Sequence, residues 1–217
     1  SAYTLMVFLI SILLGLSMGS GTVFSLQYGA GDLSALRRSI YVSLLLIGTV
    51  TILLNVAVFL WLDPILRWLQ VPYDIYSLMR NYLWIIFWGI VFTFLYNFYA
   101  ALLRAVGDSV TPLWFLAVSV VLNIGLDLFL ILVLDQGIEG AAVATVIAQG
   151  TAASGILLYT YKTRPELRLH REDMCFDRSS LREITSFSTL TCVQQSVMNF
   201  GILMVQGLVN SFGTVVM

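Results

Sequence analysis

The sequence has few charged residues, and this scarcity excludes most soluble proteins. Asp, Glu, Lys and Arg make up 11% of the 217 residues, whereas hydrophobic residues make up 59%. A soluble domain carries about 25% charged residues. The mean hydropathy is +0.92, and long uncharged segments in such a chain favour transmembrane helices. The sequence therefore predicts an all-α integral membrane protein, a polytopic bundle of helices.

Cysteine and histidine are also scarce, which excludes several kinds of site. Cys175, Cys192 and His170 are the only residues of these types, too few for a disulfide framework or a Cys/His metal centre. Basic residues form no stripe outside the loops, so we expect no nucleic-acid partner. The sequence has no phosphate-binding glycine loop, no serine elbow and no paired carboxylates within an apolar stretch. We expect neither an enzyme nor a bound cofactor.

Six apolar stretches are long enough to cross roughly 30 Å of hydrocarbon at about 1.5 Å per helical residue. They are Ser1–Gly31, Ser39–Leu62, Asn81–Leu103, Ser109–Leu134, Gly140–Tyr161 and Ile184–Met217. We predict a transmembrane helix at each. The segment Asp63–Arg80 is too charged to span and too apolar to be a free loop. We expect it to lie along the outer membrane interface.

Basic residues gather in alternate connections between the predicted helices. Nine of the eleven Lys and Arg residues lie in the connections after the first, third and fifth stretches. By the positive-inside rule, these three connections are cytoplasmic. The last of them, 162–183, holds 11 of the 23 charged residues. We interpret it as a cytoplasmic linker between the helices of 1–161 and the first helix of a second group in 184–217.

Asp127 is the only charged residue inside any of the long apolar stretches. A carboxylate at this depth costs about 2.5–3.5 kcal/mol on insertion scales, and such residues mark ion or proton pathways. Asn123 lies one helical turn earlier on the same face. Asp127 and Thr145 are equally far from the turn near Gln136, so antiparallel helices hold them at matching depth. Amide, carboxylate and hydroxyl oxygens suit Na⁺, and a carboxyl removed from water can instead take up a proton.

Each of these residues also has a structural interpretation. Asp127 could make an interhelical hydrogen bond as a protonated acid, and Asn123 could join two helices. Thr145 could donate to the carbonyl four residues earlier in its own helix. Gly15 and Gly19, four residues apart, are expected to let two helices approach closely, which is a packing role.

Several polar or aromatic residues in other stretches are candidates for a substrate cavity. They are Gln27, Tyr96, Asn97, Gln194 and Met198. Tyr96 lies in an aromatic stretch that could bind an apolar cation on its ring faces, and lipid-facing packing is the alternative. Met198 could equally fill a packing gap. The polar side chains around Gln194 indicate a buried or partly wet helix face.

Four segments together resemble the multidrug and toxic compound extrusion (MATE) family of transporters. They are GLSMGSGTVFSLQYGAGD (15–32), ALLRAVGDSVTP (101–112), VLNIGLDLFL (121–130) and GIEGAAVAT (137–145). These resemble, in order, the second helix with its turn, the fourth-to-fifth turn, the fifth helix and the start of the sixth. The resemblance implies twelve helices in two six-helix lobes. This chain, which we interpret as an internal part of a longer protein, would supply the second to seventh.

The resemblance also implies a function and a site. Such a protein would export organic cations or other xenobiotics across the inner (plasma) membrane in exchange for Na⁺ or H⁺, and would be monomeric in full-length form. The family's cation site uses an Asn and an Asp of the fifth helix and a Thr of the sixth, which correspond to Asn123, Asp127 and Thr145. It also uses an acid on the first helix, which this chain lacks. The Glu that some relatives carry on the seventh helix is absent here too.

Two other functions stay open at this point. A lipid-linked oligosaccharide flippase of the same superfamily would need Arg or Lys within the spans for its anionic substrate, and the apolar stretches contain neither. A non-transporting membrane scaffold would tolerate loss of the Asp127 charge and would hold a partner at the helix in 184–217.

Overall fold

The computed structural model describes residues 2–68, 73–173 and 176–211, so that Cys175 lies outside the described residues. The described residues form helices without any strand, which confirms the predicted all-α fold. A five-residue π-helix, η1 (Phe129–Val133), extends the fourth long helix. The long helices are α1 (Ala2–Gly29), α2 (Leu33–Trp68), α3 (Tyr73–Ala105), α4 (Val110–Leu128), α5 (Gly137–Thr163) and α6 (Arg178–Ser211).

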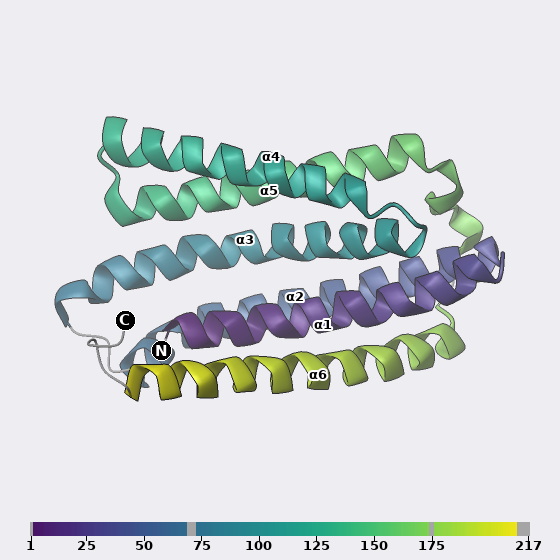
Figure 1. Cartoon of the computed structure of the whole chain (residues 1–217), viewed down its shortest axis with the longest axis horizontal. Coiled ribbons are helices and arrows are strands. Elements are labelled where there is room, and N and C mark those ends of the chain that lie inside the picture. Colours follow the sequence, from purple (N-terminus) through teal and green to yellow (C-terminus); the bar gives the residue numbers. More distant parts are fainter. Residues whose placement is uncertain (1, 69–72, 174–175, 212–217) are drawn as a thin grey trace.

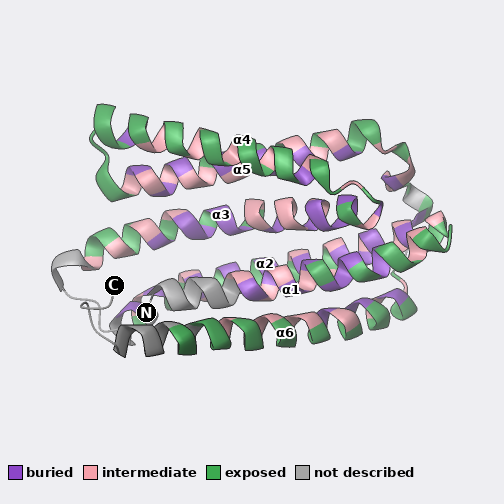
Figure 2. Ribbon diagram, in the orientation of Figure 1, coloured by how far each residue is buried: buried purple, intermediate pink, exposed green. Residues whose placement is uncertain are grey.

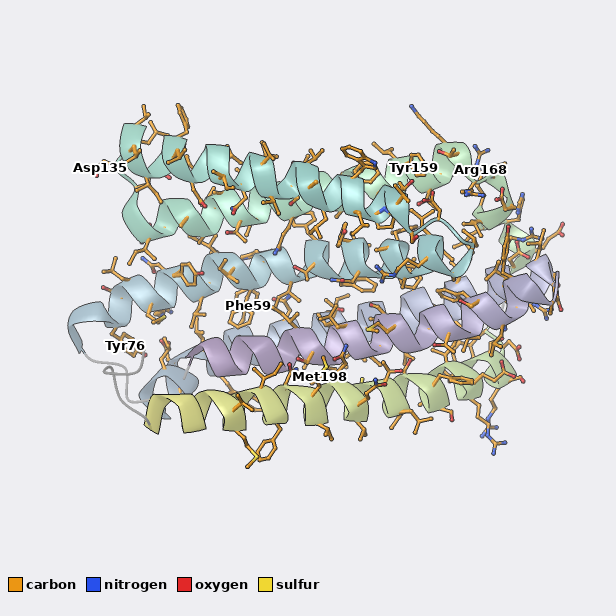
Figure 3. All side chains as sticks on the ribbon, viewed as in Figure 1. Phe59, Tyr76, Asp135, Tyr159, Arg168 and Met198 are labelled. Carbon is orange, nitrogen blue, oxygen red and sulfur yellow. The ribbon has the colours of Figure 1, made fainter. Side chains whose placement is uncertain are left out.

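The long helices lie side by side in layers (Figure 1). α4 and α5 lie together on one side, α3 separates them from α1 and α2, and α6 covers α1 on the far side. The α1–α2, α3–α4 and α5–α6 connections meet at one end of the bundle, and the α4–α5 turn lies at the other. Figure 3 labels Tyr159 and Arg168 near the first end and Asp135 at the second. The three basic connections therefore share one end, as their charge predicted.

Among the described residues, five helices are long and apolar enough to cross a membrane. These segments are 10–29, 33–64, 76–105, 110–133 and 137–163. α6, which covers most of the sixth predicted span, is not among them, because Ser, Thr, Gln and Asn recur along it. Figure 2 shows exposed residues along much of α4, where Trp114 and Val121 are 69% and 71% exposed, and Leu132 in η1 is 74% exposed. A continuous apolar outer face of this kind suits contact with lipid.

The segment Asp63–Arg80 differs from the interfacial element that its composition predicted. Its described residues belong to the ends of two long helices, because α2 continues past Pro64 to Trp68 and α3 begins at Tyr73. Asp63 holds these ends together: its Oδ1 accepts from Arg80 Nε over 2.9 Å and from the Tyr76 hydroxyl over 3.0 Å. Two of the charges that made the segment look unable to span, those of Asp63 and Arg80, thus pair with each other at one end of the bundle.

α1 and α6 approach closely at two glycines. A Cβ atom at Gly15 would lie 2.8 Å from the Cα of Cys192, and a Cβ at Gly19 would overlap the backbone of Ser188. The Ser188 hydroxyl donates to the carbonyl of Leu16 over 3.3 Å. Without side chains at the two glycines the helices can pack backbone against backbone, so the predicted close approach at Gly15 and Gly19 is confirmed.

The connection between α5 and α6 is fixed to the start of α2. Arg37 Nε donates to Asp173 Oδ2 over 2.8 Å, and Asp173 is only 7% exposed. α6 begins at Arg178, inside the predicted linker 162–183. The Asp177 carboxylate accepts from backbone N–H groups of the first turn, which starts the helix there. The boundary between two groups of helices stays a prediction.

Candidate functional site

Two of the predicted ion ligands meet between α4 and α5. Asn123 Nδ2 donates to Thr145 Oγ1 over 3.4 Å, and Thr145 Oγ1 donates to the carbonyl of Ala141 over 2.9 Å. Both polar side chains are half-buried. The interhelical contact and the local bond within α5 therefore coexist. The equal distance from the α4–α5 turn predicted that Thr145 would lie level with Asp127, but the hydrogen bond is with Asn123, one turn further from the turn. The role of these residues as ion ligands stays a prediction.

Asp127 lies one helical turn beyond Asn123 and two residues before the π-helix η1. Its Oδ1 atom is buried and accepts no hydrogen bond from any described residue. Leaving a buried polar atom without a partner costs about 1–3 kcal/mol, and more when it is charged. π-helical turns interrupt the regular α-helical ladder and are frequent at functional sites. Binding of a proton or a small cation by this carboxyl stays a prediction.

The oxygens around Asp127 set what kind of cation could bind. Among the described residues, no three His, Cys, Asp or Glu side chains lie close enough together to hold a metal ion. A cation at Asp127 would therefore take one carboxylate and neutral oxygens such as those of Asn123 and Thr145. Such a donor set suits a hard, singly charged ion better than a transition metal, which prefers nitrogen or sulfur.

A cavity of about 570 Å³ lies between α1, α3, α4 and α5. Small-molecule sites typically have volumes of about 300–1,000 Å³. Tyr96 and Asn97, two of the predicted cavity residues, line it. Leu14, Leu113 and Leu116 give it apolar walls, and Thr93, Arg104, Ser119 and Gln149 add polar groups. This combination of apolar walls with a few polar groups is the usual make-up of a ligand pocket.

Hydrogen bonds fix the polar groups of the cavity. Thr93 Oγ1 donates to Gln149 Oε1 over 2.8 Å, which joins α3 to α5. Asn97 Nδ2 donates to the carbonyl of Thr93 over 2.8 Å within α3. The Tyr96 hydroxyl donates to the carbonyl of Pro112 over 2.8 Å and joins α3 to α4. Hydrogen bonds to another helix therefore fix Thr93, Gln149 and Tyr96 in the cavity wall, and a bond within α3 fixes Asn97.

The cavity and the Asp127 site adjoin along α4 and α5. Ser119, in the cavity wall, precedes Asn123 by one turn of α4, and Gln149 follows Thr145 by one turn of α5. One turn of four residues rises about 6 Å. A stripe of polar side chains thus runs from the cavity past the Asn123–Thr145 contact to Asp127.

Three predicted cavity residues lie elsewhere. Gln27 is near the end of α1, outside the cavity wall, and its Oε1 is buried without a hydrogen-bond partner among the described residues. Gln194 and Met198 are exposed on α6, and Figure 3 labels Met198 there. The contacts of α6 with α1 come from neighbouring positions instead, since Gln195 Nε2 donates to Met18 Sδ over 3.2 Å.

Sequence reasoning missed Thr93, Gln149 and Arg104 as cavity residues. Thr93 and Gln149 are neutral, and neutral polar residues in apolar helices commonly serve only to join helices. Gln149 nevertheless carried a signal, because it follows Thr145 by one turn on the same helix face. Arg104 lies at the end of α3, where an arginine is ordinary, so only the packing of α4 beside it reveals its place in the wall.

The sequence matches the family described as MatE over residues 1–129. A Bacillus subtilis protein named as a probable multidrug resistance protein, YpnP, is 34% identical over 97% of this chain and 47% of its own length. The multidrug export protein MepA of Staphylococcus aureus is 32% identical over 75% of this chain and 37% of its own length. The chain thus spans about half the length, or less, of these curated relatives.

Solved structures of MATE transporters share the fold. An inward-facing MATE transporter superposes with a TM-score of 0.83 at 21% identity, over 89% of this chain and 44% of the other. An outward-facing one gives 0.85 at 20% identity, over 93% and 45%. MATE transporters are not enzymes, which agrees with the lack of catalytic motifs. The match over most of the sequence, the multi-pass helical fold and the relatives together show that this chain belongs to the MATE family of transporters.

Proposed function

We propose that this chain is part of a secondary transporter that exports small amphipathic molecules in exchange for Na⁺ or H⁺, with Asp127 binding the coupling ion. The observation that carries the proposal is the buried Oδ1 of Asp127, which lacks a hydrogen-bond partner among the described residues and lies one turn from the Asn123–Thr145 contact. A proton or a Na⁺ would give this oxygen the partner that the protein does not supply.

The cavity is the proposed substrate site. Its volume of about 570 Å³ and its apolar walls suit a drug-sized molecule. The polar stripe from Gln149 to Asp127 puts ion and substrate on the same two helices. An ion that binds more tightly to one conformation of these helices shifts the population of that conformation, and with it the affinity for the substrate. Direct contact between ion and substrate is not needed.

The family resemblance adds the remaining parts of the proposal. Organic cations and other xenobiotics are the substrate class that it implies, and the inner (plasma) membrane is the location. The linker 162–183 would lie on the cytoplasmic side, because it shares the basic end of the bundle. Residues 1–161 would belong to the first lobe of a monomeric transporter, and 184–217 would begin the second.

The test is Asp127→Asn in the full-length transporter, with Asp135→Asn as the matched control. Asp135 is an exposed acid in the α4–α5 turn, at a backbone φ of 52° that Asn also adopts readily. Dye efflux is measured in cells while the Na⁺ and pH gradients are varied separately. We expect Asp127→Asn to abolish the gradient-dependent part of efflux and Asp135→Asn to leave it unchanged. Normal expression of Asp127→Asn with full ion-coupled efflux would reject the proposal.

A further inference from the structure

The cavity wall contains one charged side chain among its thirteen described residues, and that side chain is positive. Arg104 lies in the last turn of α3, and no Asp or Glu lines the cavity. The other polar groups of the wall are hydroxyls and amides, which are neutral. The net charge of this part of the wall is therefore positive.

Arg104 also lacks an acidic partner. The structure shows ion pairs for Arg37 with Asp173 at 2.8 Å and for Arg164 with Asp108 at 3.9 Å, but none for Arg104 within the described parts of the chain. Asp108 is the nearest acid in sequence, and it already accepts hydrogen bonds from Thr111. The guanidinium of Arg104 is therefore available to a bound molecule.

A solvated arginine at a helix end is the ordinary interpretation of such a residue, because its charge interacts favourably with the carbonyl end of the helix. Two observations go beyond it. Arg104 borders the 570 Å³ cavity and also a second hollow of about 380 Å³ between α1 and α3. In the first cavity it lies seven residues beyond Asn97 on α3, which places the two about 10 Å apart along the helix.

We propose that Arg104 is a specificity-determining residue that binds an acidic group, a carboxylate or sulfonate, of an amphipathic substrate. The apolar body of that substrate lies against Leu14, Leu113 and Leu116. A planar guanidinium binds a carboxylate through two parallel hydrogen bonds. The same charge disfavours a cationic group at this end of the cavity. The inference rests on the proposed function in one respect, that the cavity is the substrate site.

The experiment compares two dyes that differ in one group: a rhodamine with a free carboxyl and the methyl ester of the same dye. Equilibrium binding of each to the purified full-length transporter is measured by fluorescence polarisation without an ion gradient. The variants are Arg104→Gln, Arg104→Lys and Arg104→Glu. Lys162→Gln is the control, because Lys162 is exposed at the end of α5 and outside the cavity wall.

We expect Arg104→Gln to weaken binding of the free acid about tenfold or more, because losing one hydrogen bond to a charged group lowers affinity by about tenfold. Binding of the ester should change by less than about twofold, which also shows that the variant is folded. Arg104→Lys should keep most of the affinity for the acid, Arg104→Glu should favour the ester, and Lys162→Gln should change neither. Equal weakening of both dyes by Arg104→Gln, no change in either, or no binding of either dye to the unmodified transporter would overturn the inference.

This outcome is separable from that of the proposed ion coupling. Asp127→Asn acts on gradient-driven efflux of both dyes, whereas Arg104→Gln acts on equilibrium binding of one dye. If Asp127→Asn leaves coupled efflux intact while Arg104→Gln discriminates between the dyes, the ion site is wrong and the specificity role stands.

Discussion

Gly15→Ala tests the close packing of α1 on α6. In the present structure the added Cβ would lie 2.7 Å from the Sγ and 2.8 Å from the Cα of Cys192, whereas ordinary van der Waals contact begins at 3.4 Å. The Sγ could rotate away, but the Cα belongs to the backbone of α6 and can move only with the helix. The two helices would therefore have to separate by several tenths of an ångström around Gly15.

The magnitude follows from two opposing effects. Overpacking in a well-packed interface costs about 1–3 kcal/mol, and Ala in place of Gly in a helix interior returns up to about 1 kcal/mol. We expect a net loss of about 1–2 kcal/mol for Gly15→Ala. The matched control is Gly125→Ala on α4, where an added Cβ meets no atom within 4 Å. At Gly125 only the higher helix propensity of Ala over Gly acts, so Gly125→Ala should be neutral or stabilising.

Thermal unfolding of the purified full-length transporter in detergent measures both variants. The midpoint should fall for Gly15→Ala and should hold or rise for Gly125→Ala. Gly19→Ala should fall further, because its Cβ would overlap the backbone of Ser188. A midpoint for Gly15→Ala equal to or above that of Gly125→Ala would show that α1 and α6 do not pack at this distance, and the reasoning from glycine spacing would be refuted.

Two further changes test the turn before α4 and the wall of the cavity. Burial raises the pKa of the Asp108 carboxyl, but hydrogen bonds from the Thr111 backbone and hydroxyl lower it, so that overall the pKa lies below its ordinary value of 3.8. Asp108 therefore contributes stability that is fully present above about pH 3.8 and is lost as the pH falls through its lowered value. Asp108→Ala removes the acceptor of the Thr111 backbone and hydroxyl and should cost about 1 kcal/mol at neutral pH. Thermal unfolding should show this difference shrinking in acid; a constant difference would contradict the assignment. Gln149→Ala removes a polar group of the cavity wall and the interhelical acceptor of the Thr93 hydroxyl, and should weaken dye binding about two- to tenfold. Thr151→Ala, at an exposed position on the same helix, should not weaken it. Equal binding by the two variants would place the substrate elsewhere.

Spacing predicted part of the site. An antiparallel pair of helices was expected to bring Thr145 level with Asp127, since both lie nine residues from Gln136. The two helices do bring polar residues together, but Thr145 bonds with Asn123, one turn further from the α4–α5 turn. Gln194 and Met198 show the limit of that reasoning. The polar amide of Gln194 and the flexible side chain of Met198 are suited to a cavity, but both side chains are exposed on α6. α6 contacts α1 through Ser188, Gln195 and Asn199 instead. Which face of a single helix meets a neighbour depends on contacts that its own sequence does not contain.

The segment Asp63–Arg80 shows a related limit. The composition of the segment shows that it is charged, but it does not show which charged residues pair. Asp63, Tyr76 and Arg80 meet because the ends of α2 and α3 come together. A charged residue lowers the hydropathy of its segment by the same amount whether or not an oppositely charged residue lies beside it in the fold. Hydropathy therefore placed the helices well and their ends less well.

The amino-acid sequence by itself determined the helical membrane fold and the shared end of the three basic connections, because hydropathy and charge act along one chain; it also predicted Asp127 as an ion ligand. Only the tertiary structure decided that Asp127 Oδ1 lacks a partner among the described residues, that Gln149 and Thr93 bond across α3 and α5, and that Arg104 enters the cavity wall. These features arise where side chains from different helices meet, and that meeting is fixed by packing in three dimensions.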